Sequence, residues 1–437
     1  MKRIGDETKK WILDALSRGY RDSEIKELLL DNGYKILDIK KSIEEVKSSK
    51  DFGKNLNFDE SVKSDMPSFE ELKETIGEKK IKPLPVTKIS PERDKREINK
   101  IASRVLHREK KPEVDSEFSQ EVKEVSRLLE LVRHEISKSL IGQKETVNAV
   151  LCAILCNGHV LLEGVPGIAK TLLVKSMSDA LGSESKRIQF TVDLLPSDIT
   201  GITTYTPERG FETIKGPIFA NFLLADEINR SPPKTQSALI ESMQEKQVTI
   251  AKETYKLPQP FFVMATENPL ESSGVYDLPE AQVDRFLFKL IVGYPESPED
   301  EKKIMDTNMT TKKFEDFGIQ PVLNPNKIIR MQGVVKKVYM DDKIKDYIVK
   351  IVHKTRKKDF NYGEFVDWGG SPRATIALFI ASKAWALMQG RTYVIPEDVR
   401  KISHYVLRHR IILNYKAHAE GITSDKVIDE ILSIISI

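Results

Sequence analysis

The segment GVPGIAKT, residues 164–171, constrains this chain more than any other stretch. An apolar run, residues 160–162, precedes it and a second, residues 172–174, follows it, which is typical of a strand, a tight loop and a helix. Small residues in such a loop let backbone N–H groups close around phosphate oxygens at a helix N-terminus. The predicted phosphate-binding loop consists of Gly164, Val165, Pro166, Gly167, Ile168, Ala169, Lys170, Thr171 and Leu172.

Two residues of this loop have defined expected roles. Lys170 is expected to reach the β- and γ-phosphates, and the Thr171 hydroxyl is expected to hold Mg²⁺. Ala169 stands where G-x-x-x-x-G-K-[ST] has its second glycine, and alanine adopts helical angles readily, so the helix can begin there. The alternative is a glycine-rich turn that carries a Lys-Thr pair by chance, and the acidic residues downstream argue against it.

These acidic residues follow an apolar run at residues 222–225. A buried parallel strand delivers the side chains at its carboxyl end to the edge where ligands bind. Asp226 is therefore expected to hold Mg²⁺ through water, and Glu227 to orient and polarise the water that attacks the γ-phosphate. A strand that ends in two acids by chance fits poorly after a phosphate loop at this spacing.

Asn268 ends a further apolar run, residues 260–266. Its amide could hydrogen-bond the attacking water or the γ-phosphate, and a structural Asn-Pro turn is the alternative. Upstream of the phosphate loop, Ile141 and Gly142 belong to a short turn of the kind that lines an adenine pocket in related ATPases.

Two arginines are further candidates for phosphate contacts. Arg285 could reach the nucleotide of a neighbouring subunit, or it could pair with Asp284 or Glu280 at the surface. Arg373 follows Ser-Pro, which suits an N-cap and a first helical position, so it could point at a phosphate from a helix start. An ordinary surface arginine is the alternative for Arg373.

Composition sets wider limits. A chain of 437 residues is long enough for two to three domains, at about 100–200 residues each. The net charge of +3 gives no indication of a nucleic-acid or membrane surface. The polar start and the lack of an apolar run near the ~18 residues needed to span a bilayer favour a soluble, cytoplasmic protein.

Cys152 and Cys156 lie four apart in an apolar helical pattern without matched metal-ligand partners, so we expect buried structural cysteines.

Changes in pattern along the chain predict four parts. They are a small helical module at 1–47, a charged flexible linker at 48–118, an α/β ATPase core at 119–298 and a helical lid at 299–437. The module at 1–47 loosely resembles ubiquitin-associated three-helix bundles, and it could be a docking module or a structural appendage. The linker at 48–118 is dense in Lys and Glu, which is typical of a solvated tether, although its basic stretch could contact an acidic partner.

From about residue 119 onward the chain resembles the MoxR family of AAA+ ATPases. Beyond the phosphate loop, the motifs that carry the resemblance are residues 193–201, 216–220, 226–236, 280–286, 371–374 and 406–410. The resemblance implies an α/β P-loop wedge with a five-stranded parallel sheet, followed by an all-α lid. Small departures are Glu267, where the family often has Gln, and Ser272-Ser273; neither position has a predicted catalytic role.

The resemblance also implies roles and partners. It makes Asn268 sensor one, Arg285 an arginine finger and Arg373 sensor two, which we expect to join the γ-phosphate to a lid that hinges near residues 293–298. It implies ATP and Mg²⁺ as cofactors, a ring oligomer that is typically a hexamer, and chaperone-like work on protein complexes. A von Willebrand A-domain protein is a possible partner on the same ground.

A different class of function stays open as an alternative. A DNA-associated AAA+ motor or a chelatase-type subunit could also carry an insert such as residues 191–216. The insert mixes acidic and basic residues, which disfavours nucleic acid. A binding scaffold without turnover is disfavoured by the intact Glu227.

Overall fold

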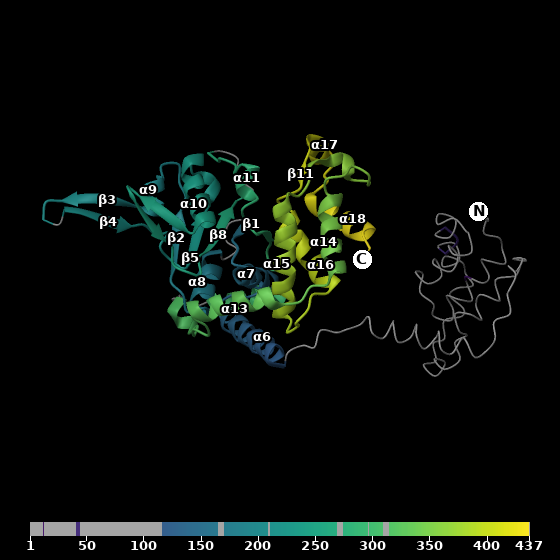
Figure 1. The fold of residues 1–437 in the computed structure, drawn as a ribbon, viewed down its shortest axis with the longest axis horizontal. Helices are drawn as coiled ribbons and strands as arrows, with labels where there is room; N and C mark the ends of the chain where they lie inside the picture. Colours follow the sequence, from purple (N-terminus) through teal and green to yellow (C-terminus); the bar gives the residue numbers. More distant parts are fainter. Residues whose placement is uncertain are drawn as a thin grey trace, which may run out of the picture. The chain divides into compact units, whose positions relative to one another are not determined.

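Five parallel strands form the centre of the described chain, in the order β2-β5-β8-β1-β9 (Figure 1). The pairs β1–β8, β1–β9, β2–β5 and β5–β8 are all parallel. The strands are β1 (Val160–Gly164), β2 (Ser185–Gln189), β5 (Phe222–Asp226), β8 (Phe262–Glu267) and β9 (Phe288–Val292). This confirms the predicted P-loop wedge with a five-stranded parallel sheet.

The computed structural model describes residues 12, 41–43, 116–164, 170–208, 210–268, 274–295, 297–308 and 314–436. Residues 12 and 41–43 are helical, and the Ile12 and Ile43 side chains are buried. The rest of the predicted N-terminal module and nearly all of the predicted linker lie outside the described residues, as do Val165, Pro166, Gly167, Ile168 and Ala169 of the phosphate loop.

The strands of the sheet are apolar on both faces because helices cover both. On one face, Val160 and Leu162 pack in a core formed by α7 (Lys144–Leu155) and α8 (Lys170–Ala180) together with the lid helices. On the other face, Leu161 and Leu223 pack against α10 (Pro233–Glu245). A strand buried on both faces reads as a continuous apolar run, which is why the sequence pattern located β1, β5 and β8.

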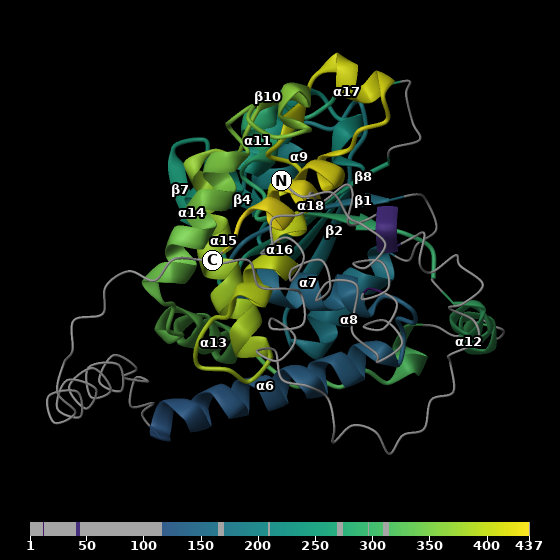
Figure 2. The ribbon, with the colours of Figure 1, turned by 90° about the vertical axis from the view of Figure 1, so that its right-hand side faces the viewer.

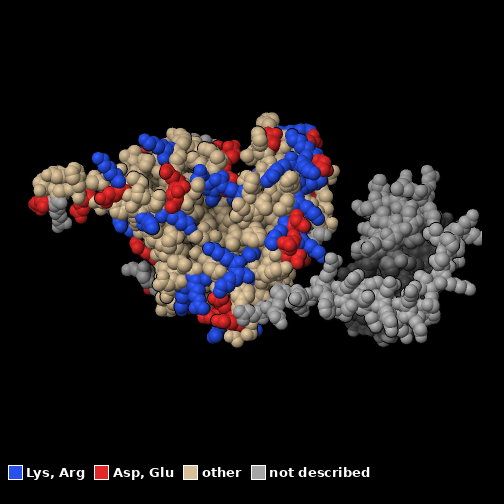
Figure 3. All heavy atoms as spheres, in the orientation of Figure 1, with Lys and Arg blue, Asp and Glu red and all other residues tan. Residues whose placement is uncertain are grey.

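Short helices and two hairpins lie between the sheet strands in the chain or follow β9. They are α9 (Pro196–Thr200), η3 (Ile228–Arg230), α11 (Glu280–Val283), α12 (Pro298–Asn308) and η4 (Phe314–Phe317), with β3 (Gly201–Thr206) paired to β4 (Gly210–Lys215) and β6 (Gln247–Ile250) paired to β7 (Glu253–Lys256). The β3–β4 hairpin extends from the body of the wedge (Figures 1 and 3).

The long helix α6 (Ser116–Ser137) packs along one side of the body, against α8, α13 (Pro325–Lys337) and α15 (Pro372–Met388) (Figure 2). Its buried residues recur every three or four positions, which places them on one helix face: Val122, Val125, Leu129, Val132 and Ile136. None of the helices in the described residues is both long and apolar enough to cross a membrane.

The lid follows the wedge and is mostly helical, as predicted. Its elements are α13 (Pro325–Lys337), α14 (Asp342–Lys354), η5 (Gly363–Phe365), β10 (Val366–Trp368), α15 (Pro372–Met388), α16 (Pro396–Leu407), β11 (Ile412–Leu413), α17 (Tyr415–Ala419) and α18 (Ser424–Ile434). The prediction of an all-α lid missed β10 and β11, which form an antiparallel pair between segments 40 to 50 residues apart in the chain.

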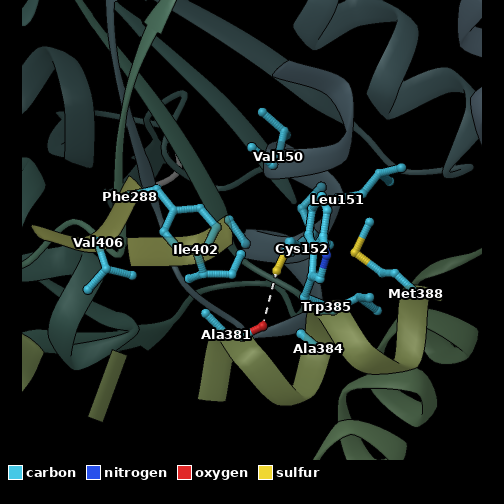
Figure 4. Close-up of a cluster of buried hydrophobic side chains, with 14 of the residues drawn as sticks. Val150, Leu151, Cys152, Phe288, Ala381, Ala384, Trp385, Met388, Ile402 and Val406 are labelled. Atoms are coloured by element: carbon cyan, nitrogen blue, oxygen red, sulfur yellow. Dashed lines mark hydrogen bonds between the residues drawn. The ribbon is translucent and has the colours of Figure 1, made fainter. Parts of the chain in front are cut away.

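The lid and the wedge share one hydrophobic core. Cys152 of α7 is fully buried, and its Sγ lies 3.6 Å from the main-chain oxygen of Ala381 in α15 (Figure 4). Trp385 from α15 and Ile402 from α16 pack around the same cysteine (Figure 4). Cys152 is therefore a buried structural residue, as expected, and Cys156 is half-buried.

Candidate nucleotide-binding site

Lys170 opens α8 directly after the phosphate loop. Its Nζ donates to the main-chain oxygen of Gly164 at 2.7 Å and to that of Glu267 at 3.4 Å. The lysine thus joins the carboxyl ends of two adjacent strands, β1 and β8. The next residue, Thr171, is exposed, and Leu172 is half-buried.

Asp226 is the last residue of β5 and is held by two neighbouring strands. The Thr266 hydroxyl in β8 donates to Asp226 Oδ1 at 2.7 Å. On the other side, Arg187 in β2 donates to Asp226 Oδ2 through Nε at 3.1 Å and Nη2 at 2.7 Å. Both carboxylate oxygens therefore have fixed directions.

Glu227 adopts a left-handed backbone conformation, with φ 57° and ψ 52°. This conformation is uncommon for a residue with a side chain, and such outliers cluster at functional sites. The Glu227 amide donates to the Thr266 hydroxyl at 2.8 Å. Its carboxylate accepts a hydrogen bond from Gln189 Nε2 at 2.6 Å and lies 3.2 Å from Arg230 Nε. The glutamate is thus held at the strand edge by main-chain and side-chain contacts.

Asn268 follows β8 directly and is buried. The preceding Glu267 lies in an acidic cluster beside Lys289, whose Nζ is 2.5 Å from a Glu163 oxygen and 3.9 Å from a Glu267 oxygen. Burial raises the pKa of Glu267, the charge of Lys289 lowers it, and the carboxylates of Glu163 and Asp277 raise it further. A glutamate at this position therefore binds a proton more readily than an exposed one.

The expected adenine turn lies at the same edge of the sheet. Gly142 has a φ of +77°, and a Cβ there would lie 3.3 Å from Pro295, just beyond β9. Gln143 Nε2 donates to the main-chain oxygen of Gly293 at 3.2 Å. Ile141 is half-buried in this turn.

The carboxyl ends of β1, β5 and β8 therefore gather Lys170, Asp226, Glu227 and Asn268. This set fits a nucleotide with Mg²⁺, because a lysine can bind phosphate oxygens while a carboxylate and the Thr171 hydroxyl supply hard oxygen ligands. The described residues contain no group of three or more His, Cys, Asp or Glu side chains that could hold a metal. A metal that takes most of its ligands from phosphate and water needs no such group.

The two predicted arginines lie at the opposite edge of the sheet. Arg285 lies just before β9. The amide of Leu287 donates to the main-chain oxygen of His159, which lies directly before β1. Because β1 and β9 run parallel, this edge is a strand length, roughly 16 Å, from the phosphate loop. Arg285 is exposed, and among the described residues its guanidinium has no ion pair or hydrogen bond.

Arg373 does not lie where we expected. Its Nη1 is 3.2 Å from Asp284 Oδ2, and both arginines line a cavity of about 420 Å³ at the amino-terminal edge of the sheet. The cause is the packing of the lid: α15 lies against α6 and α7, so its first turn meets the segment before β9. Arg373 thus lies at the edge of the sheet away from the phosphate loop, and its contact with a γ-phosphate stays a prediction.

The sequence patterns did not assign Arg187, Gln189 or Thr266, although all three bond the acidic pair. Arg187 and Gln189 are two apart in a strand and so face the same side, which was a readable signal. The sequence could not predict that β2 lies next to β5, because strand order is a non-local property.

Comparison with known proteins identifies the family. Residues 159–288 match the ATPase family associated with various cellular activities (AAA), and residues 363–431 match the AAA lid domain. The chain is 45% identical over 303 residues to the uncharacterized protein YeaC of Bacillus subtilis, covering 69% of this chain and 92% of YeaC. It is 44% identical over 319 residues to Chaperone MoxR1 of Mycobacterium tuberculosis, covering 71% of this chain and 82% of that protein.

A third relative, Protein MoxR of Paracoccus denitrificans, is 31% identical over 295 residues, covering 63% of this chain and 86% of the relative. The crystal structure of a protein from Cytophaga hutchinsonii that is proposed to be an ATPase superposes with a TM-score of 0.68 at 42% identity, covering 72% of this chain and 97% of that one. The predicted resemblance is thus confirmed, and this chain belongs to the MoxR family of AAA+ ATPases.

Proposed function

We propose that this protein hydrolyses ATP with Mg²⁺ in a ring oligomer and uses the cycle to remodel or mature protein complexes. The observation that carries the proposal is the division of the site between two edges of one sheet. Lys170, Asp226 and Glu227 lie at the carboxyl edge, and Arg285 and Arg373 at the amino edge. This division of the residues supports a nucleotide site that a second subunit completes.

Each residue of the carboxyl edge has a role in this proposal. Lys170 binds the β- and γ-phosphates, and Asp226 and Thr171 hold Mg²⁺, which neutralises charge on the phosphates. Glu227 accepts a proton from the attacking water, and Asn268 orients that water. Arg187 and Gln189 hold the Asp226 and Glu227 carboxylates at this edge.

Subunits joined head to tail would supply the arginines that each nucleotide site lacks. Head-to-tail contacts form a ring when the rotation between neighbours closes on itself. In that ring the amino edge of one subunit faces the carboxyl edge of the next. Arg285 and Arg373 of one subunit then stabilise the charge that develops on the neighbour's γ-phosphate. The exposed guanidinium of Arg285 suits a contact made only on assembly.

A protein client fits the β3–β4 hairpin better than nucleic acid does. Residues 201–215 carry two Glu, one Arg and one Lys, so they offer no net positive charge to a phosphate backbone. The tilted rings of Tyr205 and Phe211 are in contact near the hairpin end, with 5.2 Å between ring centroids, and Phe211 is 80% exposed. The name of Chaperone MoxR1 supports protein remodelling as the class of work.

The test combines activity with assembly state. Phosphate release and particle mass are measured for the purified protein with and without ATP and Mg²⁺, at the same protein concentration. The proposal predicts that hydrolysis per subunit rises with protein concentration in step with formation of the oligomer. Full hydrolysis by a protein that stays monomeric would refute it.

A further inference from the structure

The turn that ends α16 binds a run of main-chain carbonyl groups in the wedge. Arg408 Nη1 donates to the oxygen of Lys289 at 2.9 Å. His409 Nε2 lies 3.1 Å from the oxygen of Phe286. Burial, followed by the charge of Arg410, holds the pKa of His409 well below its usual range, so the ring is neutral and donates through Nε2 to this carbonyl.

Arg410 makes the largest share of these contacts. Its Nη1 donates to the oxygen of Leu287 at 3.1 Å, and its Nη2 donates to the oxygens of Asp284 at 3.1 Å and Phe286 at 2.7 Å. Its Nε lies 2.7 Å from Asp284 Oδ1, and its side chain is only 3% exposed. A planar guanidinium can serve several acceptors in fixed directions, which a lysine cannot do.

The bonded carbonyls lie on both sides of Arg285. Residues 284–287 form a turn between α11 and β9. The wedge holds the amides of this turn, because those of Asp284, Arg285 and Phe286 donate to oxygens of α11 and that of Leu287 donates to the oxygen of His159. The lid holds the carbonyl oxygens through Arg410, so a residue 125 positions later in the chain helps to fix the conformation from which the Arg285 side chain leaves the backbone.

Asp284 connects the second arginine to the same unit. One of its carboxylate oxygens accepts from Arg410, and the other accepts from the Ser371 hydroxyl at 3.0 Å and from Arg373 Nη1 at 3.2 Å. The start of α15, the end of α16 and the turn that carries Arg285 are thus held around one carboxylate.

We propose that Arg410 is a positioning residue for Arg285 and Arg373, which the lid and the wedge hold together as one rigid unit for contact with the next subunit's nucleotide. This inference rests on the proposed function, in which both arginines act across a subunit boundary. It assigns the lid a role at the amino edge of the sheet of its own chain, where it holds the arginines in place.

The test uses Arg410→Met in mixed oligomers. Alone, the variant should bind ATP normally and lose about 10²-fold in kcat at unchanged KM, the size of loss that a small misplacement of a reacting group causes. Mixed with Lys170→Ala it should regain activity, because the Lys170→Ala subunit supplies a correctly held Arg285 and the Arg410→Met subunit supplies an intact nucleotide site. Mixed with Arg285→Ala it should stay inactive, because neither subunit supplies that arginine correctly.

Controls separate positioning from loss of fold. Arg391→Met breaks a second arginine–aspartate pair inside the lid, with Asp398, and touches none of residues 284–289, so its kcat should stay near that of the unchanged protein. Arg410→Lys keeps the charge beside Asp284 while losing most of the carbonyl contacts. It is measured in the same mixtures and should show the same pattern of recovery, so the positioning role is tested even if Arg410→Met folds poorly.

The outcomes distinguish this inference from the proposed function. If Lys170→Ala and Arg285→Ala fail to restore each other in oligomers that form, the proposed function fails first. If they do restore each other, the positioning role is tested separately. It is overturned if the Arg410→Met and Arg410→Lys proteins regain hydrolysis equally with Lys170→Ala and with Arg285→Ala, or if they regain it with neither. A normal kcat for both variants also overturns it.

Discussion

Arg373 Nη1 lies 3.2 Å from a carboxylate oxygen of Asp284, the residue directly before Arg285. A lid arginine and a wedge arginine are thus presented at one cavity, on the edge of the sheet away from the phosphate loop. The lid shares its core with the wedge and is hydrogen-bonded to this turn. This relationship supports the proposal that Arg373 acts on a neighbour's nucleotide.

Glu227→Gln should leave ATP bound and reduce hydrolysis by about 10²–10⁴-fold, the contribution of a positioned general base. The amide keeps the size of the side chain and its contact with Gln189, but it cannot accept the proton of the water. Phosphate release and nucleotide binding are measured on the same preparation. Glu245→Gln, an exposed change at the end of α10, is the matched control, and equal rates for the two variants would remove Glu227 from the mechanism.

Arg187→Met should lower the Mg²⁺ concentration that gives half-maximal hydrolysis. The guanidinium competes with a metal for Asp226 Oδ2, which lies 2.7 Å from Nη2. Because Arg187 is half exposed, the effect should be about two- to fivefold, the scale of a partly solvated ion pair. Lys186→Met, one residue away and on the other face of the strand, should leave the Mg²⁺ requirement unchanged. A Mg²⁺ requirement that is equal or higher in Arg187→Met would show that the pair does not oppose metal binding.

The elements nearest the phosphate loop were the most predictable from the sequence. Continuous apolar runs located β1, β5 and β8, and Ser371 accepts from the amide of Arg373 as an N-cap, as the Ser-Pro pattern predicted. These features depend on local periodicity and capping, which neighbouring residues determine.

The features that the sequence did not reveal depend on distant contacts. The left-handed Glu227 is held by Thr266, 39 residues away, and no glycine at that position signals the conformation. The location of Arg373 depends on how α15 packs against α6 and α7, since an arginine at a helix start gives no indication of the edge it faces. The roles of Arg408, His409 and Arg410 depend on the same packing.

His159 should make the fold less stable in mild acid. Burial lowers its pKa to about 4 from an ordinary value of 6.5, while its Nε2 and Nδ1 bond the main chain at Met243 and Val263. The unfolded chain therefore binds the proton more readily, so the stabilisation is complete above pH ~6.5 and is lost as the pH falls toward 4.

The measurement is the free energy of unfolding by urea at pH ~7.5 and pH ~5. Between these values His159 should account for about 2 kcal/mol of lost stability, by linkage from its two pKa values. His159→Gln can keep both main-chain hydrogen bonds without titrating, so its loss should be smaller by that amount. His409 titrates in the same direction and is present in both proteins, so its contribution cancels when their two losses of stability are compared. Parallel losses in the two proteins would contradict the assignment to His159.

The central claim is that two subunits complete one nucleotide site, and mixing two inactive proteins tests it most directly. Lys170→Ala should lose nucleotide binding and keep Arg285, whereas Arg285→Ala should bind ATP and hydrolyse it slowly. ATP hydrolysis is measured as the two are combined at a fixed total concentration, with co-assembly verified through differently tagged subunits. The account predicts that activity rises to a maximum at intermediate ratios, where a Lys170→Ala subunit presents its arginine to an ATP-bound neighbour. Mixed oligomers that form and stay as inactive as the separate proteins would contradict it.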